Sequence, residues 1–163
     1  MLTNEIIEYL SLHNISIGIS IDGRKEKNDV NRVDVFGNGT YDQICKGIKL
    51  IRENKMVSKK IKNIWGLCTA TNDNCDFVDI LSHFNELGFQ NVQIRLIRSN
   101  IKYKVDEIKY QYSRLAKELL SMYREGNLDY FRMIMNDNDQ FGKVLKRMML
   151  DHLLIRRCNA GSN

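Results

Sequence analysis

The stretch Ile15-Ser-Ile-Gly-Ile-Ser-Ile-Asp22 alternates isoleucine with small or polar residues without a break. Successive side chains of a strand point to opposite faces, so a β-strand places all four isoleucines on one side. That side suits packing beneath helices. The opposite side is too small and polar for a strand buried on both faces, or for the filled interior of an ordinary barrel. We expect this polar side to line a chamber for a ligand; serines facing bulk solvent would remove the basis of that expectation and of the function inferred from it.

Helix and strand patterns alternate on both sides of this segment. Helical spacing predicts helices at 3–14, 40–54, 77–87 and 105–124, and strand patterns predict strands at 15–22, 61–71 and 91–97. Residues 128–157 read as mostly helical, with a break expected at 136–139. Strands and helices that alternate at this spacing are typical of right-handed parallel βαβ units, which predicts an α/β fold. A half-exposed sheet with one wet face is the alternative interpretation.

The ends of the predicted strands carry the candidate site residues. Ligands of parallel sheets and barrels bind at the C-terminal ends of strands, which here are 20–23, 69–71 and 95–98. Gln93 and Arg95 share one side of the third strand. A buried arginine without a partner would be very costly, so Arg95 needs an anionic group, water or an open interior.

Composition and charge exclude several classes of protein. The chain has 163 residues, of which 43% are hydrophobic and 28% charged, as in ordinary globular domains. No apolar run approaches the roughly 20 residues of a membrane helix, and the N-terminus lacks a basic signal region, so we expect a cytoplasmic protein without a membrane. The net charge of +5 is dispersed, and the basic runs 55–62 and 156–157 contain no aromatic residues for base stacking. Nucleic-acid binding is therefore disfavoured.

The cysteines and histidines form no recognisable catalytic or metal motif. Cysteines stand at 45, 68, 75 and 158 without a C-x-x-C pair, which argues against a zinc ribbon or a disulfide framework. Cys45 and Cys68 are expected in the core. Cys75 lies at a helix start, where the macrodipole could lower the pKa of a thiol, although a structural role is favoured. The three histidines lie on separate predicted elements and form no recognisable triad or metal pair. The catalytic residues are therefore unknown.

Six short motifs together resemble the middle of radical SAM enzymes that carry a SPASM domain, the maturases of sulfatases and of ribosomally made peptides. In chain order they are Ser20-Ile-Asp22-Gly23, Asn28-Asp29-x-Asn31-Arg32, Gly37-x-Gly39-x-Tyr41, Thr71-Asn72 followed by Asp76-Phe77, Glu86-Leu-Gly88-Phe89, and Arg157-Cys158-Asn-Ala-Gly161. Each motif is weak alone, but their order and spacing over nearly the whole chain are specific.

The resemblance implies part of a TIM-type (βα) barrel with parallel strands, followed by a helical C-terminal segment. Residues 1–100 would be the second half of the barrel, 101–157 a helical extension or linker, and 158–163 the start of a truncated SPASM domain. The family's C-x-x-x-C-x-x-C motif, which holds the radical-generating four-iron four-sulfur cluster, is absent from this sequence. The chain therefore resembles a central fragment that cannot bind the radical cluster alone.

The resemblance also implies cofactor-binding roles for residues at the strand ends. The cofactors would be S-adenosylmethionine and four-iron four-sulfur clusters. Ser20 would hydrogen-bond the ribose, Asp22 would anchor the strand end, and Arg32 would pair with the methionine carboxylate. Thr69 and Thr71 would complete the cofactor-binding set. Cys158 would be the first cysteine ligand of an auxiliary cluster in the SPASM domain.

The resemblance implies that the chain is a fragment of a maturase, an enzyme that modifies a peptide or protein by S-adenosylmethionine-dependent radical chemistry. The partner would be a leader peptide or a sulfatase-like protein, and the chain alone would be inactive without the cluster motif. Two alternatives stay open: a non-catalytic peptide- or nucleotide-binding module, and a basic α/β nucleic-acid-binding domain. Open strand edges predict a marginally stable chain that forms oligomers or associates with missing segments.

Overall fold

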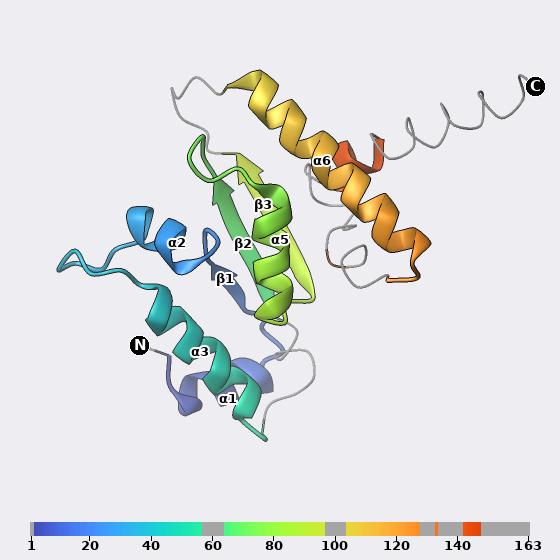
Figure 1. The fold of residues 1–163 in the computed structure, drawn as a ribbon. Coiled ribbons are helices and arrows are strands. Elements are labelled where there is room, and N and C mark those ends of the chain that lie inside the picture. The colour runs from blue at the N-terminus through green and yellow to red at the C-terminus, as the bar shows by residue number, and fades with distance from the viewer. Residues whose placement is uncertain (1, 57–63, 97–103, 128–132, 134–141, 148–163) are drawn as a thin grey trace, which may run out of the picture.

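The computed structural model describes residues 2–56, 64–96, 104–127, 133 and 142–147 (Figure 1). In chain order its elements are α1 (Asn4–Leu12), β1 (Gly18–Ser20), α2 (Lys25–Asn31), α3 (Tyr41–Glu53), β2 (Trp65–Ala70), α5 (Phe77–Glu86), β3 (Asn91–Leu96) and α6 (Val105–Arg124). Residues 142–147 are also helical. Among the described residues, no helix combines the length and apolar character needed to cross a membrane.

The strands form one parallel sheet in the order β1-β2-β3. Gly18 of β1 lies opposite Trp65 of β2, which in turn lies opposite Asn91 of β3. Helix α3 lies between β1 and β2 in the sequence, and α5 lies between β2 and β3. The predicted α/β fold with parallel strands is confirmed.

Local sequence signals explain where the helices begin and end. The Thr3 hydroxyl accepts a hydrogen bond from the Ile6 N–H at the start of α1, and the Asp76 carboxylate accepts one from the Asp79 N–H at the start of α5. After α5, Gly88 adopts φ +70°, a conformation that costs glycine little. Phe89 then folds back, and its ring lies 5.0 Å from that of Phe84.

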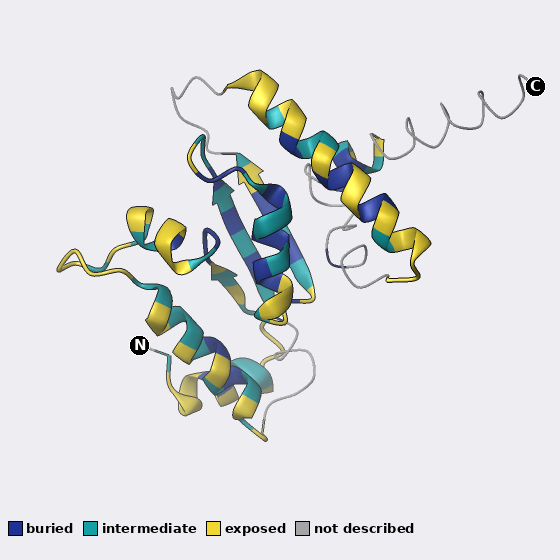
Figure 2. Cartoon of the chain, viewed as in Figure 1, coloured by how far each residue is buried: buried dark blue, intermediate teal, exposed yellow. Residues whose placement is uncertain are grey.

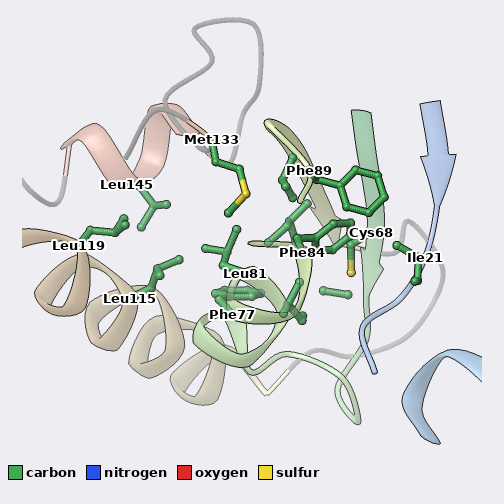
Figure 3. Close-up of a cluster of buried hydrophobic side chains, with 14 of the residues drawn as sticks. Ile21, Cys68, Phe77, Leu81, Phe84, Phe89, Leu115, Leu119, Met133 and Leu145 are labelled. Carbon is green, nitrogen blue, oxygen red and sulfur yellow. The ribbon is translucent and has the colours of Figure 1, made fainter. Parts of the chain in front are cut away.

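The core lies between one face of the sheet and the helices that cover it. Gly66, Cys68 and Ala70 of β2 point to this face, and all three are buried. Figure 3 shows Cys68 beside Phe84 of α5, and Leu115 and Leu119 of α6 beside Met133 and Leu145. These side chains belong to one cluster of buried apolar residues, so α5 is covered by the sheet on one side and by α6 on the other.

Gly66 is required by the close packing of α5 on the sheet. A Cβ atom at this position would lie 2.3 Å from Cε1 of Phe84, closer than real Cβ contacts allow. The ring of Phe84 is fully buried, so it has little room to move away. The small residue on β2 thus sets the distance between helix and sheet.

The first strand and the loop after it differ from the sequence-based expectation. The regular strand is Gly18–Ser20 rather than 15–22, and Ile15 is 45% exposed. The described residues pair β1 only with β2, so part of the alternating segment has no ladder to join. Between β1 and α3, where no helix was predicted, the chain forms α2, which lacks an apolar stripe and has Asn28 as its buried residue.

Several expectations fall partly or wholly outside the described residues. These are the beginning and end of the second and third predicted strands (61–63 and 97), most of the predicted helical region 128–157, and the whole of 158–163. Within 128–157, residue 133 and residues 142–147 are helical, as predicted.

Candidate functional site

One face of the sheet is left open by the described residues. Along β2 the buried residues alternate with half-buried ones, so Trp65, Leu67 and Thr69 point away from the helices. On β1 the exposed residues are Gly18 and Ser20. Figure 2 shows buried and half-buried residues alternating along β2, and exposed residues in β1. We call the side of the sheet that carries Gly18 and Ser20 of β1 and Trp65, Leu67 and Thr69 of β2 the open face.

The chamber expected from the serines of 15–22 is not enclosed by the described part of the chain. Ser16 and Ser20 are both exposed. A sheet of three strands is too narrow to curl around a ligand, so its polar side faces outward instead. A ligand of this chain would therefore bind to an open surface, and the half-exposed sheet with one wet face describes this part of the molecule.

Asp22 organises the C-terminal end of the sheet. Its side chain is buried, and its carboxylate forms an ion pair with Arg32, with Nε to Oδ2 at 2.8 Å and Nη2 to Oδ1 at 3.0 Å. Oδ1 also accepts a hydrogen bond from the Thr69 N–H at 2.8 Å. One carboxylate thus joins the end of β1, the end of α2 and the neighbouring strand β2.

Two buried asparagines hold the backbone of Asp22. The Asn28 side chain accepts a hydrogen bond from the Asp22 N–H at 3.1 Å, and the Asn74 side chain donates to the Asp22 carbonyl. Gly23 follows with φ +104°, a conformation that residues with a Cβ atom rarely adopt. The chain therefore turns away from the sheet at a fixed point, and Arg32 returns to it after α2.

The Asn28-Asp29 pair continues this network toward α3. Asn28 donates a side-chain hydrogen bond to Asp29, whose carboxylate accepts one from the Tyr41 N–H at 2.9 Å. A Cβ atom at Gly39 would lie 2.1 Å from Cγ of Asp29, so the second glycine of the 37–41 motif leaves room for this carboxylate. The three motifs at 20–23, 28–32 and 37–41 thus contact one another directly.

The structure brings four of the predicted cofactor-binding residues to one end of the sheet. Ser20 lies on the open face, Asp22 and Arg32 form the ion pair beside it, and Thr69 donates its backbone N–H to that pair. Thr71 lies in the turn after β2, where its backbone pairs with that of Asn74. The predicted metal ligand at position 158 lies outside the described residues.

Cys68 lies in the core as expected, whereas Cys45, also expected there, is only half-buried. Cys68 and Cys75 are buried, and burial raises the pKa of both thiols. For Cys75, burial and the nearby Glu107 carboxylate raise the pKa of the thiol, in agreement with the structural role that the sequence analysis favoured. Within the described ranges, no three histidine, cysteine or acidic side chains are grouped so that they could hold a metal ion.

A polar network on the helix side of the sheet was missed by the sequence analysis. The Tyr41 hydroxyl lies 2.9 Å from Nε2 of His83, and Nδ1 of His83 lies 3.5 Å from a Glu86 carboxylate oxygen. Arg24 contacts both carboxylate oxygens of Glu86 at 2.7 and 2.9 Å, and it also pairs with Asp79 at 2.9 Å. The network fastens the loop after β1 and the start of α3 to α5.

The protonation of this network follows from burial and charge. Burial lowers the pKa of His83, although the Glu86 carboxylate works in the opposite direction. Burial raises the pKa of Tyr41 to about 12, and the hydrogen bond from Arg24 lowers the pKa of Glu86 to about 2. His83 and Glu86 are one helical turn apart, but Arg24 and Glu86 are 62 positions apart, so the sequence offered no signal for the full network.

Known proteins resemble this chain in sequence over part of their length. No family model matches it. A cysteine-type anaerobic sulfatase-maturating enzyme of Clostridium perfringens strain 13 is 27% identical over 128 residues, which cover 75% of this chain and 33% of that enzyme. The same enzyme from a second strain is 26% identical over the same length. The chain spans about a third of the length of these relatives.

Solved structures show the same fold. Native anSMEcpe with bound AdoMet has a TM-score of 0.64 and 20% identity, over 78% of this chain and 36% of that chain. The complex of native anSMEcpe with AdoMet and the Cp18Cys peptide gives the same values. The resemblance to radical SAM maturases that the motifs indicated is confirmed: the chain is similar to part of an anaerobic sulfatase-maturating enzyme.

Proposed function

We propose that this chain is the second half of a radical SAM maturase barrel and supplies a binding surface for S-adenosylmethionine and a peptide substrate. Residues 1–100 would form the half-barrel, 101–157 the helical extension and 158–163 the start of a SPASM domain. The similarity to sulfatase-maturating enzymes supports this assignment, as does the parallel order β1-β2-β3. The relatives' bound AdoMet and peptide belong to those proteins and motivate the ligands proposed here.

The observation that carries the proposal is the gathering of polar groups at the C-terminal end of the sheet. The Ser20 hydroxyl is exposed there and would hydrogen-bond the ribose. Asp22 would orient Arg32, whose side chain is still 29% exposed and would receive the methionine carboxylate. Thr69 at the end of β2 and Thr71 in the turn that follows it would bound the cofactor on that side.

The radical chemistry would need groups that this sequence does not contain. S-adenosylmethionine supplies a 5′-deoxyadenosyl radical when an iron–sulfur cluster reduces it, whereas the protein binds and orients the reactants. The sequence has four cysteines and no C-x-x-x-C-x-x-C motif. We therefore propose that the chain alone binds without turnover, and that Cys158 would ligate an auxiliary cluster together with cysteines from elsewhere.

Calorimetry with S-adenosylmethionine tests this function directly. We expect binding to the unmodified chain, and about fivefold weaker binding to Ser20→Ala, the effect of losing one hydrogen bond. Ser16→Ala is the matched control, because Ser16 is also exposed and precedes the strand at its other end. No detectable heat at millimolar ligand would refute the proposed function, and equal losses in both variants would remove Ser20 from the site.

A further inference from the structure

Arg95 lies on the open face, at the same end of the sheet as the Asp22–Arg32 pair. Along β3 the side chains of Val92 and Ile94 are buried toward the helices, whereas Gln93 is half-buried and Arg95 exposed. In the parallel register Arg95 lies opposite Thr69, whose backbone N–H binds Asp22. The backbone of Arg95 is thus level with the strand end at Thr69, and its guanidinium lies against Gln93, the preceding residue on the same face of β3.

Among the described residues, a neutral side chain and no carboxylate holds Arg95 in place. Its Nη2 donates a hydrogen bond to Oε1 of Gln93 at 2.8 Å, so a neutral amide orients the guanidinium. In the described part of the chain, Arg24, Arg32 and Arg114 each pair with a carboxylate, but no carboxylate forms an ion pair with Arg95. The open face thus carries a positioned cation without an acidic partner from the described residues.

A guanidinium in this setting favours one class of ligand. Arginine presents several N–H donors in a planar fork that matches a carboxylate, and such charge-assisted pairs are stronger than neutral hydrogen bonds. Gln93 accepts from one of these donors, and no other described side chain is bonded to the rest, so they can serve a ligand. Ligands of parallel sheets bind at the C-terminal ends of strands, which is where Arg95 stands.

We propose that Arg95, oriented by Gln93, is a carboxylate-binding residue that selects ligands of the open face by their negative charge. The inference rests on the proposed function, in which this face binds the cofactor and the peptide. Arg32 is already engaged by Asp22 and is assigned to the methionine carboxylate, so an acidic side chain of the peptide is the source that fits Arg95. The carboxylate of S-adenosylmethionine is the second source of the same chemistry.

Two pairs of probes separate these sources. The first pair consists of the peptides Ala-Cys-Ala-Glu-Ala and Ala-Cys-Ala-Gln-Ala, both blocked at their ends, and the second of S-adenosylmethionine and its decarboxylated analogue. Dissociation constants are measured by calorimetry or by NMR of labelled arginine Nε–H groups. We expect the Glu peptide to bind about tenfold tighter than the Gln peptide, the effect of one charge-assisted pair.

Three variants assign the preference to Arg95. Arg95→Gln should bind both peptides equally, and Arg95→Lys should keep part of the preference because it keeps the charge. Arg124→Gln removes the same charge from the exposed last turn of α6 and should leave the preference unchanged. Unchanged circular dichroism and urea midpoints show that the variants fold, which is expected because Arg95 is exposed and so is its hydrogen bond to Gln93.

The outcomes distinguish this inference from the proposed function. A preference for S-adenosylmethionine over its decarboxylated analogue that Arg95→Gln abolishes supports the carboxylate role and identifies the cofactor as the source. Three results would overturn the carboxylate-binding role of Arg95. These are equal binding of the two probes in both pairs, a preference that persists in Arg95→Gln, and no binding of any probe. Binding of S-adenosylmethionine without any charge preference defeats the inference alone, whereas an Arg95-dependent peptide preference without cofactor binding defeats the proposed function alone.

Discussion

Asp22 is the residue whose loss should cost the most at the candidate site. Asp22→Asn keeps the size of the side chain but removes the charge opposite Arg32, leaving a largely buried guanidinium without its ion-pair partner. Breaking such a pair by changing one member should lower the free energy of unfolding by about 3 kcal/mol. Urea unfolding followed by circular dichroism measures this change.

The matched control is Asp73→Asn, in the turn after β2. Asp73 is exposed, and its contact with Lys27 uses the backbone carbonyl rather than the side chain. Its substitution should change stability by less than about 0.5 kcal/mol. Equal midpoints for the Asp22 and Asp73 variants would contradict the role given to the Asp22–Arg32 pair.

His83 should make the stability of the fold depend on pH. The folded chain holds the pKa of His83 below its ordinary value of 6.5, so the unfolded chain takes up this proton first as the pH falls. The free energy of unfolding should therefore decrease as the pH is lowered below 6.5. The groups that face the imidazole are Tyr41 on α3, Glu86 on the same helix, and Arg24, which bridges Glu86 and Asp79.

Urea midpoints measured between pH 5 and pH 8 test this dependence. His83→Gln keeps a polar group beside the Tyr41 hydroxyl but cannot titrate, so its midpoint should change less across this range than that of the parent chain. The lowered pKa of Glu86, about 2, places its own contribution at much lower pH. A parent chain that is more stable at pH 5 than at pH 8 would contradict the prediction.

The sequence predicted single residues well where a local rule applied and poorly where distant segments meet. The turn at Gly23 after the first strand and the end of α5 at Gly88 both depend on the freedom of glycine to adopt a positive φ, and both glycines are visible in the sequence. The Tyr41–His83 contact joins residues 42 positions apart, and a single sequence carries no signal for such a pair. The cofactor roles assigned by resemblance stay predictions.

At the scale of elements, packing of α5 on the sheet depends on Gly66. Gly66→Ala would place a Cβ atom 2.3 Å from Phe84 Cε1, and the buried ring can move only by disturbing its contact with Phe89. Overpacking of this kind costs about 1–3 kcal/mol, which urea unfolding would detect.

Gly18→Ala provides the comparison on the neighbouring strand. At Gly18 the nearest atom to an added Cβ is Leu67 Cδ1 at 3.4 Å, and the position lies on the open face. We expect no loss of stability, and a small gain because alanine restricts the unfolded chain more than glycine does. Equal destabilisation by both alanines would show that glycine is needed in these strands for another reason.

The spacing of apolar residues predicted the order and type of most elements, whereas the length of a strand depends on the neighbouring strand with which it pairs. Helix α6 and strand β3 match the predicted segments because their apolar residues repeat regularly. Strand β1 is shorter than its alternating sequence because a strand extends only as far as its neighbour pairs with it. Helix α2 was missed because its seven residues present no apolar stripe.

At the scale of the molecule, the described surface favours self-association. The loop between α2 and α3 is fixed by hydrogen bonds from the Phe36 and Asn38 N–H groups to the Asp34 carboxylate. It presents Val35 and Phe36 to solvent, 93% and 84% exposed. An uncovered sheet face and an apolar loop of this kind are surfaces that other copies of the chain can bind.

We therefore expect a sedimentation coefficient that rises with protein concentration, and a smaller rise for the double variant Val35→Ser/Phe36→Ser. Val35 and Phe36 have few contacts to lose, so the double variant should keep its urea midpoint. A monodisperse monomer with a sharp, cooperative thermal transition would contradict this prediction and would indicate that the three-stranded sheet is sufficient by itself.

The bonds around Asp22 also determine which part of the sheet opens last. The amide of Ile21 is bound to the Leu67 carbonyl, and the amide of Thr69 is bound to the Asp22 carboxylate, so both are held near the turn at Gly23. In hydrogen–deuterium exchange these two amides should be among the slowest in the chain, while amides near Ile15 exchange early. Thermal fluctuations would then fray the sheet from its opposite end, and the edge that meets a ligand would keep its shape longest.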